Sequence, residues 1–125
     1  MTGQRAVLAG AVLGGLGVTF GAFGAHALAG RLSPADLQIF ETGARYQMYH
    51  GIALVALGAW LDRRAVPKLV WAARAWIAGT VIFSGSLYLL VLTGVRALGA
   101  ITPLGGVALI AGWLLVAADA AGADR

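Results

Sequence analysis

The chain has 125 residues, of which 60% are hydrophobic and 11% are charged, with a formal net charge of +4. An ordinary soluble domain carries about a quarter charged residues, so this composition excludes one and predicts an integral membrane protein. The sequence has no cysteine, which excludes disulfides and thiolate metal sites, and it has no basic, aromatic stretch that would suggest a nucleic-acid surface.

Residues 6–28 are the first apolar segment, and glycine recurs along it in steps of four and three. These predicted helix-packing residues are Gly10, Gly14, Gly17, Gly21 and Gly24. A repeat of 3.5 residues is typical of a helix seam that faces a partner. In a bilayer, small residues on such a seam let two backbones come close, so we expect other helices to pack against this one.

The same segment imitates a cleavable signal peptide. Arg5 precedes the apolar run, and Ala25-His26-Ala27 supplies the small-x-small motif that such peptides carry. The apolar region of a signal peptide is normally about 7–15 residues long, and this run is longer. A membrane span is therefore favoured over a signal peptide.

A second helix is predicted to begin at Ser33, which has the features of an N-cap, with Pro34 at the first helical position and Asp36 at the third. The helical pattern then continues to about Leu61, which is longer than a bilayer core of about 30 Å requires. We expect residues 34–43 to form an amphipathic extension at the interface and residues 45–61 to cross the membrane. A bend at Gly43 is one way to join the two parts.

Two further spans are predicted at residues 69–92 and 98–118. Thr93 and Gly94 are expected to close the third helix, and residues 119–125 are expected to form a frayed polar tail. The four tryptophans are interpreted as interface anchors: Trp60, Trp71, Trp76 and Trp113.

The predicted fold is all-α: a four-transmembrane-helix bundle that forms a single domain over residues 1–125. Four spans place both termini and the 62–68 turn on one side of the membrane. That side carries six cations and the other side three: Arg5, Arg63, Arg64, Lys68, Arg74 and Arg125 against Arg31, Arg45 and Arg96. The positive-inside rule then predicts a multi-pass protein of the bacterial inner membrane with both termini in the cytoplasm.

Polar residues gather in the half of the bundle that this topology places away from the cytoplasm. The candidate binding residues are His26, Glu41, Thr42, Arg45, Tyr46, Tyr49, His50, Ser84, Tyr88 and Thr102. One interpretation is a functional pocket or relay, because ionisable groups at membrane depth are costly. The other is structural: Glu41 pairs with Arg45 at the lipid–water boundary, and the two histidines cap or bridge helix ends.

No catalytic, metal or cofactor site is predicted. His26, Glu41 and His50 lack the spacing of a metal motif, and no HExxH pair occurs. Ser84 and Ser86 are not in a G-x-S-x-G context, and their expected role is to bond a backbone carbonyl or to pack as small residues.

Five motifs resemble the YgdD-like family of small inner-membrane proteins. They are Gly21-Ala22-Phe23-Gly24-Ala25-His26, Phe40-Glu41-Thr42-Gly43, Tyr46-Gln47-Met48-Tyr49-His50, Phe83-Ser84-Gly85-Ser86-Leu87-Tyr88 and Gly99-Ala100-Ile101-Thr102-Pro103-Leu104-Gly105-Gly106. The resemblance covers nearly the whole chain in order and spacing. It implies a bacterial inner-membrane protein of four helices in a family that also has a eukaryotic branch, and it implies no activity or catalytic residues.

Three functions remain open from the sequence. The leading one is a non-enzymatic protein that binds membrane lipids or a protein partner, either another protein or copies of itself, with the polar cluster as the recognition site. The second is an oligomeric transporter or channel for protons or a small solute, in which Glu41 and His50 titrate beside Arg45. The third, which no motif supports, is an intramembrane enzyme with Glu41 and His50 as acid and base.

Overall fold

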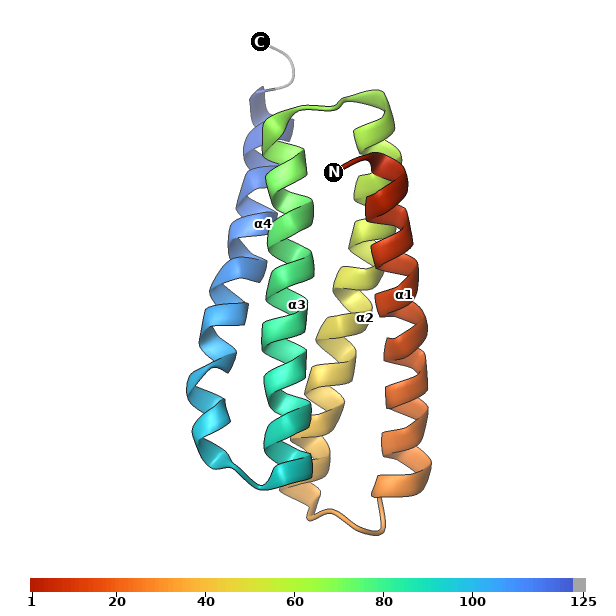
Figure 1. Ribbon diagram of the computed structural model, residues 1–125, viewed down its shortest axis with the longest axis vertical. Helices are drawn as coiled ribbons and strands as arrows, with labels where there is room; N and C mark the ends of the chain where they lie inside the picture. The colour runs from red at the N-terminus through yellow and green to blue at the C-terminus, as the bar shows by residue number, and fades with distance from the viewer. Residues whose placement is uncertain (123–125) are drawn as a thin grey trace.

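The computed structural model describes residues 1–122, and each long helix of that part of the chain runs antiparallel to the next one in sequence (Figure 1). The elements in chain order are α1 (Gly3–Phe23), a π-helical turn η1 (Gly24–Leu28), α2 (Pro34–Arg63), α3 (Pro67–Thr93), a 3₁₀ turn η2 (Arg96–Ala100) and α4 (Thr102–Gly122). Residues 1–122 contain no strand, so the all-α prediction is confirmed for them. Three helical stretches are long and apolar enough to cross a membrane: Gly3–Leu28, Pro67–Thr93 and Arg96–Gly122.

The helix boundaries follow local signals in the sequence. The Ser33 side chain accepts a hydrogen bond from the backbone N–H of Asp36 at 3.1 Å, and Pro34 is in the first turn, so the predicted start of α2 is confirmed. Gly94 ends α3 in the left-handed conformation, with φ of 74°, which glycine adopts without strain.

The first hairpin, α1 with α2, is held at close range by glycine. A Cβ added at Gly10 would lie 2.6 Å from the carbonyl oxygen of Gly51, and one added at Gly51 would lie 2.8 Å from the backbone nitrogen of Gly14. Gly58 faces the backbone of Gly3 in the same way. Because these positions lack side chains, the two backbones touch directly.

The remaining predicted packing glycines differ from one another. Gly17 faces Met48 and Gly24 faces Phe40, so both lie on the seam with α2. Gly14 and Gly21 do not point into the seam: a Cβ at either position would meet no atom within 4 Å, although the Gly14 backbone itself lies against Gly51. The seam therefore follows Gly3, Gly10, Gly17 and Gly24 at seven-residue intervals, a period that keeps one edge of a helix against an antiparallel partner.

The second hairpin, α3 with α4, is also closely packed at glycine positions. A Cβ added at Gly79 would lie 3.0 Å from the carbonyl oxygen of Gly105, and Gly112 faces the ring of Trp76. Between the hairpins, the main core cluster draws residues from all four long helices: Ala6, Leu54, Leu57, Leu61, Leu69, Ala72, Ala73, Trp76 and Leu109. A smaller cluster closes the opposite end: Leu28, Phe40, Leu90 and Val91.

Helices α2 and α4 are continuous at two places where the sequence predicted a bend or a frayed end. Helix α2 continues through Gly43 without interruption, and Phe40 and Gly43 are buried. Helix α4 continues to Gly122, so the prediction of a frayed tail is wrong for residues 119–122. The reason is Asp119, whose buried carboxylate binds Arg64 and fixes the last turns of α4. Residues 123–125, which include the cation Arg125, lie outside the described part of the chain.

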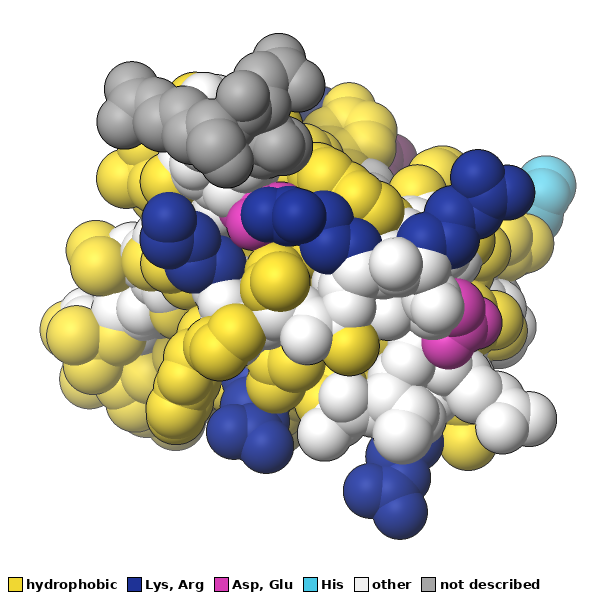
Figure 2. Space-filling view, turned by 90° about the horizontal axis from the view of Figure 1, so that it is seen from above, with side chains coloured by type: hydrophobic (Ala, Val, Ile, Leu, Met, Phe, Trp, Pro, Cys, Tyr) yellow, Lys and Arg dark blue, Asp and Glu magenta, His cyan; other side chains and the backbone are white. Residues whose placement is uncertain are grey.

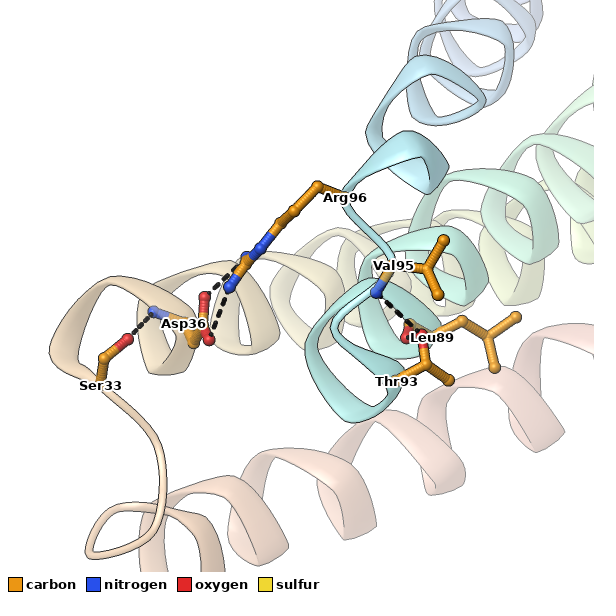
Figure 3. A network of polar contacts seen from close by, with 6 residues as sticks. All are labelled: Ser33, Asp36, Leu89, Thr93, Val95 and Arg96. Atoms are coloured by element: carbon orange, nitrogen blue, oxygen red, sulfur yellow. Dashed lines mark hydrogen bonds and ion pairs between the residues drawn. The ribbon is translucent and has the colours of Figure 1, made fainter.

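An Arg–Asp pair lies near each end of the bundle. Arg64, after α2, binds both carboxylate oxygens of Asp119 at 3.1 Å. At the other end, Arg96 binds both oxygens of Asp36 at 2.9 and 3.1 Å (Figure 3). This arginine holds the pKa of the Asp36 carboxyl below its usual range, chiefly through the hydrogen bonds. The two pairs connect segments that are 55 and 60 residues apart.

Each long helix exposes large hydrophobic side chains on the outer surface. Examples of exposed hydrophobic side chains are Leu8 and Val12 on α1, Ile52 on α2, Val81 on α3 and Leu104 on α4. Basic side chains project around the end that carries the α2–α3 loop (Figure 2). This distribution is the one expected of a helical bundle in a bilayer, where the solvent around the middle is hydrocarbon.

Candidate functional site

Gln47 connects three helices inside the bundle. Its side chain is 3% exposed, and its amide nitrogen donates to the Leu13 carbonyl on α1 at 2.9 Å. Its amide oxygen accepts from the Tyr88 hydroxyl on α3 at 2.7 Å. The Tyr88 ring also packs edge-on against Phe20, with ring centroids 5.1 Å apart. Both functional groups of the amide are therefore satisfied within the protein.

Hydroxyl groups on α3 make two further connections between helices. Ser84 donates to the Gly43 carbonyl on α2 at 2.7 Å, and Ser86 lies 2.6 Å from the Thr102 hydroxyl on α4. Together with Gln47 and Tyr88, these residues make three separate hydrogen-bonded connections between helices, and we call the set the polar belt: Gln47, Ser84, Ser86, Tyr88 and Thr102. Hydrogen bonds between membrane helices typically contribute about 1 kcal/mol each, so the belt fixes helix register more than it adds stability.

His50 lies apart from the polar belt and is 4% exposed. Its Nδ1 is 2.8 Å from the Tyr46 carbonyl oxygen, and because a carbonyl only accepts, Nδ1 carries the proton. Its Nε2 is then free to accept from the indole N–H of Trp113 at 3.0 Å. Both ring nitrogens are occupied, so this geometry holds a neutral imidazole.

Two tryptophans complete the surroundings of His50. Trp76 from α3 and Trp113 from α4 each have ring centroids 5.9 Å from the imidazole, and their own centroids are 4.5 Å apart. The indole N–H of Trp76 donates to the Leu109 carbonyl at 3.2 Å. The aromatic triad of His50, Trp76 and Trp113 thus joins α2, α3 and α4.

A groove opens beside the triad between α2 and α4. It measures about 320 Å³, and its lining consists of Tyr46, His50, Phe83, Gly106, Leu109, Ile110 and Trp113. A smaller groove of about 180 Å³ lies on the other side of Trp113: Ala53, Ala56, Leu57, Trp60, Trp76, Trp113 and Val116. We call the larger one the His50 groove. Its walls are aromatic or aliphatic apart from the imidazole and the Tyr46 hydroxyl.

The structure brings together only part of the predicted polar cluster. Ser84, Tyr88 and Thr102 belong to the polar belt, and His50 belongs to the triad. The others do not converge with them. His26 is exposed in the π-helical turn η1, and Thr42 donates to the Gln38 carbonyl of its own helix.

The outward face of α2 carries the remaining candidates. Glu41, Arg45, Tyr46 and Tyr49 are exposed, and the two tyrosine rings pack edge to face with centroids 5.6 Å apart. Neither of the two ion pairs among residues 1–122 joins Glu41 to Arg45, so the pairing expected from their spacing is not formed. Both side chains are exposed on the surface, where an ion pair contributes little stability.

The sequence interpretation missed four residues of the belt and the triad. Gln47 and Ser86 were not candidates, and Trp76 and Trp113 were assigned to the membrane interface, whereas Trp76 is 2% exposed in the core. A signal for Gln47 was present. Leu54 and Gly51 define the inner face of α2, and continuing that face by one helical turn reaches both His50 and Gln47.

The site contains no cluster suited to a metal among residues 1–122: no three His, Asp or Glu side chains come together there. Its chemistry is that of hydrogen bonding and aromatic contact. The belt and triad can orient helices, and the His50 groove can accept an apolar group beside a single polar ring.

Comparison with known proteins gives a consistent assignment. Residues 20–106 match the family described as "Protein of unknown function (DUF423)". The chain is 44% identical over 110 residues to the UPF0382 membrane protein SH2409 of Staphylococcus haemolyticus, covering 88% of this chain and 89% of that one. It is 42% identical over 111 residues to the UPF0382 membrane protein YwdK of Bacillus subtilis, covering 88% and 90%.

The Escherichia coli relative carries the name that the motifs suggested. The chain is 37% identical over 116 residues to the UPF0382 inner membrane protein YgdD of strain K12, covering 93% of this chain and 88% of that protein. No solved structure matches. The resemblance of the five motifs is confirmed, and the chain belongs to this DUF423 (UPF0382) family of membrane proteins.

Proposed function

We propose that this protein is a non-enzymatic, four-span membrane protein that binds a lipid chain in the His50 groove. The observation that carries the proposal is the groove itself: an apolar, aromatic-walled space of about 320 Å³ between α2 and α4. It opens on the side of the bundle where Ile110 and Trp113 are exposed, at 60% and 48%. In a bilayer, that opening faces acyl chains.

The proposal treats α2 as the fourth span, although its composition is the most polar of the four helices. Charged residues near both ends of the helix contribute to this, and within residues 45–61 the most polar side chains are Arg45, Gln47 and His50. Gln47 and His50 make their hydrogen bonds inside the bundle, which removes most of the penalty for placing them in hydrocarbon. Arg45 can extend toward the N-terminal end of α2, because helical side chains lean that way, and reach the interface.

The length of α2 also fits an interfacial extension. Its 30 residues span about 45 Å, about 15 Å more than a bilayer core. The excess falls at the N-terminal end, where Asp36 pairs with Arg96 and Glu41 is exposed. We infer that these first turns project into the lipid headgroups while Phe40 holds them against the bundle.

Several observations favour a lipid chain over a protein partner as the occupant. One turn of an α-helix, about 5.4 Å long and 10 Å across, takes up about 420 Å³, which is more than the groove offers. A single acyl chain is thinner and conforms to an irregular wall. The Tyr46 side chain adds one polar group to the lining that could orient a ligand in such a site.

The geometry gives the transporter and enzyme hypotheses no comparable support. Glu41 is exposed and lies nine positions from His50, about 14 Å along the helix. Both imidazole nitrogens are already bonded, to Tyr46 and Trp113. An acid–base pair or a proton relay needs groups within hydrogen-bond reach, so these residues are poorly placed for either.

Filling the groove tests the proposal. A Cβ added at Gly106 would have Phe83 3.8 Å away as its neighbour, so Gly106→Leu can occupy the groove without a backbone clash. Gly21→Leu is the matched control, because the space beside Gly21 is open. Native mass spectrometry of purified protein is expected to show retained lipid for the wild type and Gly21→Leu and less for Gly106→Leu. Equal lipid retention by all three would refute the His50 groove as the binding site.

We infer the orientation from charge. The end that carries the α2–α3 loop has five cations among residues 1–122, and the other end has three: Arg5, Arg63, Arg64, Lys68 and Arg74 against Arg31, Arg45 and Arg96. The positive-inside rule favours a cytoplasmic location for the first end, and with it for both termini. A reporter fused to the C-terminus that is active only outside the cytoplasm would overturn this orientation.

A further inference from the structure

A second groove lies on the outer face of α3, at the end that carries the α2–α3 loop. It measures about 560 Å³, and its lining consists of Pro67, Lys68, Trp71, Arg74, Ala75, Ala78 and Leu115. We call it the Lys68 groove. It shares no residue with the His50 groove. The inference drawn from it therefore does not depend on the proposed function.

The two cations of the Lys68 groove are available to bind an anion. Lys68 and Arg74 are exposed on one side of α3, about 9 Å apart along its axis. The Arg74 guanidinium lies over the Trp71 ring, with Cζ 5.0 Å from the ring centroid, which keeps it beside the groove. Neither cation forms an ion pair with a carboxylate of residues 1–122. Asp119 on the neighbouring helix is hydrogen-bonded by Arg64 and also lies within electrostatic reach of Lys68.

The rest of the groove is apolar and lies deeper along the bundle. Ala75 and Ala78 continue the same side of α3, and Ala78 lies about 15 Å from Lys68 along the helix axis. Trp71, 59% exposed, lies between the two cations along the helix axis, and Ala75 and Ala78 follow Arg74. Tryptophan at that position is typical of the level of the headgroups. The groove therefore changes from positive to apolar in the direction in which a phospholipid changes from headgroup to acyl chain.

We propose that the Lys68 groove binds an anionic phospholipid of the leaflet on that side, with its phosphate between Lys68 and Arg74 and an acyl chain over Ala75 and Ala78. Charge complementarity selects an anionic headgroup, because two cations share the site. The apolar floor selects a lipid over a free phosphate ion. Electrostatic attraction to the headgroup and apolar contact with the acyl chain are together sufficient for a basic groove beside membrane helices to recognise a lipid.

The test is a titration of the purified full-length protein in detergent, read by native mass spectrometry. Phosphatidylglycerol and phosphatidylcholine with identical acyl chains are the two probes. The wild type is expected to prefer phosphatidylglycerol, and Lys68→Gln/Arg74→Gln is expected to lower that preference roughly 25-fold, about fivefold for each cation. Arg5→Gln/Arg63→Gln, which removes the same charge from the same end outside this groove, is expected to retain most of the preference.

Two results would overturn the proposal: an unchanged preference in Lys68→Gln/Arg74→Gln, or an equal loss in both double variants, which would indicate general electrostatic attraction.

A second pair of variants tests the apolar half of the Lys68 groove. Ala78→Phe fills the floor without changing charge and is expected to weaken phosphatidylglycerol binding, whereas Ala59→Phe on the exposed side of α2 is not. Displacement of the lipid by excess inorganic phosphate, with no effect of Ala78→Phe, would show a phosphate site in place of a lipid site.

Discussion

Among single residues, the hydrogen bonding of buried hydroxyl groups distinguishes positions that look alike in the sequence. Ser84 and Thr80 stand one turn apart on α3 and are 2% and 1% exposed. Ser84 donates to the Gly43 carbonyl at 2.7 Å, whereas the Thr80 hydroxyl has no partner among residues 1–122. A buried hydroxyl without a partner lowers stability, and a bonded one raises it modestly.

This contrast predicts opposite effects of two small substitutions. Ser84→Ala is expected to lower the free energy of unfolding by about 1 kcal/mol, because it removes a bond between α3 and α2. Thr80→Val keeps the shape of the side chain and removes only the unpaired hydroxyl, so it is expected to be neutral or stabilising. Reversible unfolding in mixed micelles measures both. A larger loss for Thr80→Val than for Ser84→Ala would contradict this assignment of partners.

For α2, the sequence predicts which residues share a face of the helix, but it does not predict which neighbours that face contacts. The i, i+4 spacing of Glu41, Arg45 and Tyr49 predicted one line along the helix, and the structure has all three exposed. Which way that line faces depends on the neighbouring helices, and the spacing alone does not specify it. His50 was a candidate because it is ionisable, but its partner Trp113 is 63 residues away, and no local pattern encodes that contact.

Within the helices, glycine spacing determines how each hairpin closes. Glycines recur every seven residues along α1 and into η1, at Gly3, Gly10, Gly17 and Gly24, and Gly51 and Gly58 have the same spacing on α2. The sequence interpretation read steps of four and three on the first helix alone and so included Gly14 and Gly21, where a Cβ would meet no neighbouring atom. Comparing the two helices would have isolated the seven-residue set, because an antiparallel pair needs matching gaps on both sides.

Alanine substitutions at two glycines test the seam. Gly51→Ala places a Cβ 2.8 Å from the Gly14 nitrogen, so α1 and α2 must move apart, and we expect a loss of about 1–3 kcal/mol in unfolding free energy. Gly21→Ala meets no atom and raises helix propensity, so it is expected to be neutral or slightly stabilising. The comparison uses the same unfolding assay. Equal effects of the two substitutions would show that the close approach at Gly51 is not important.

At the scale of the whole molecule, each end of the bundle is held by an Arg–Asp ion pair that no local sequence pattern predicts. Four helices, their approximate limits and the membrane assignment follow from apolar runs, caps and turn residues, because those signals are local. The pairs Asp36–Arg96 and Arg64–Asp119 connect segments far apart in sequence. The missed pairing of Asp119 is also the reason that the end of α4 was misjudged.

The Asp36–Arg96 pair predicts a pH dependence of stability. Arg96 lowers the pKa of the folded-state Asp36 carboxyl, so the folded state binds its proton less readily than the unfolded chain does. The stabilisation is therefore complete above the ordinary aspartate pKa and is lost as the pH falls through the lowered value. Because the pair is exposed to solvent, its contribution is modest.

Thermal unfolding in detergent measures this dependence. The wild type is expected to melt at a higher temperature than Asp36→Asn at pH 7, with the difference unchanged to about pH 5 and shrinking below about pH 4. Low salt enlarges the difference, because exposed ion pairs are screened by salt. A difference that grows as the pH falls would contradict the sign of this linkage.

The central claim, that a lipid chain occupies the His50 groove, is tested most directly by crosslinking in living cells. A photoreactive amino acid replaces Ile110, which lines the groove and is 60% exposed, or Val107, which is 66% exposed on the same helix outside it. Irradiation followed by mass spectrometry identifies what each position contacts. The account predicts one enriched lipid species at position 110 and unselected bulk lipids at position 107. The same lipid mixture at both positions, or a protein adduct at position 110, would contradict it.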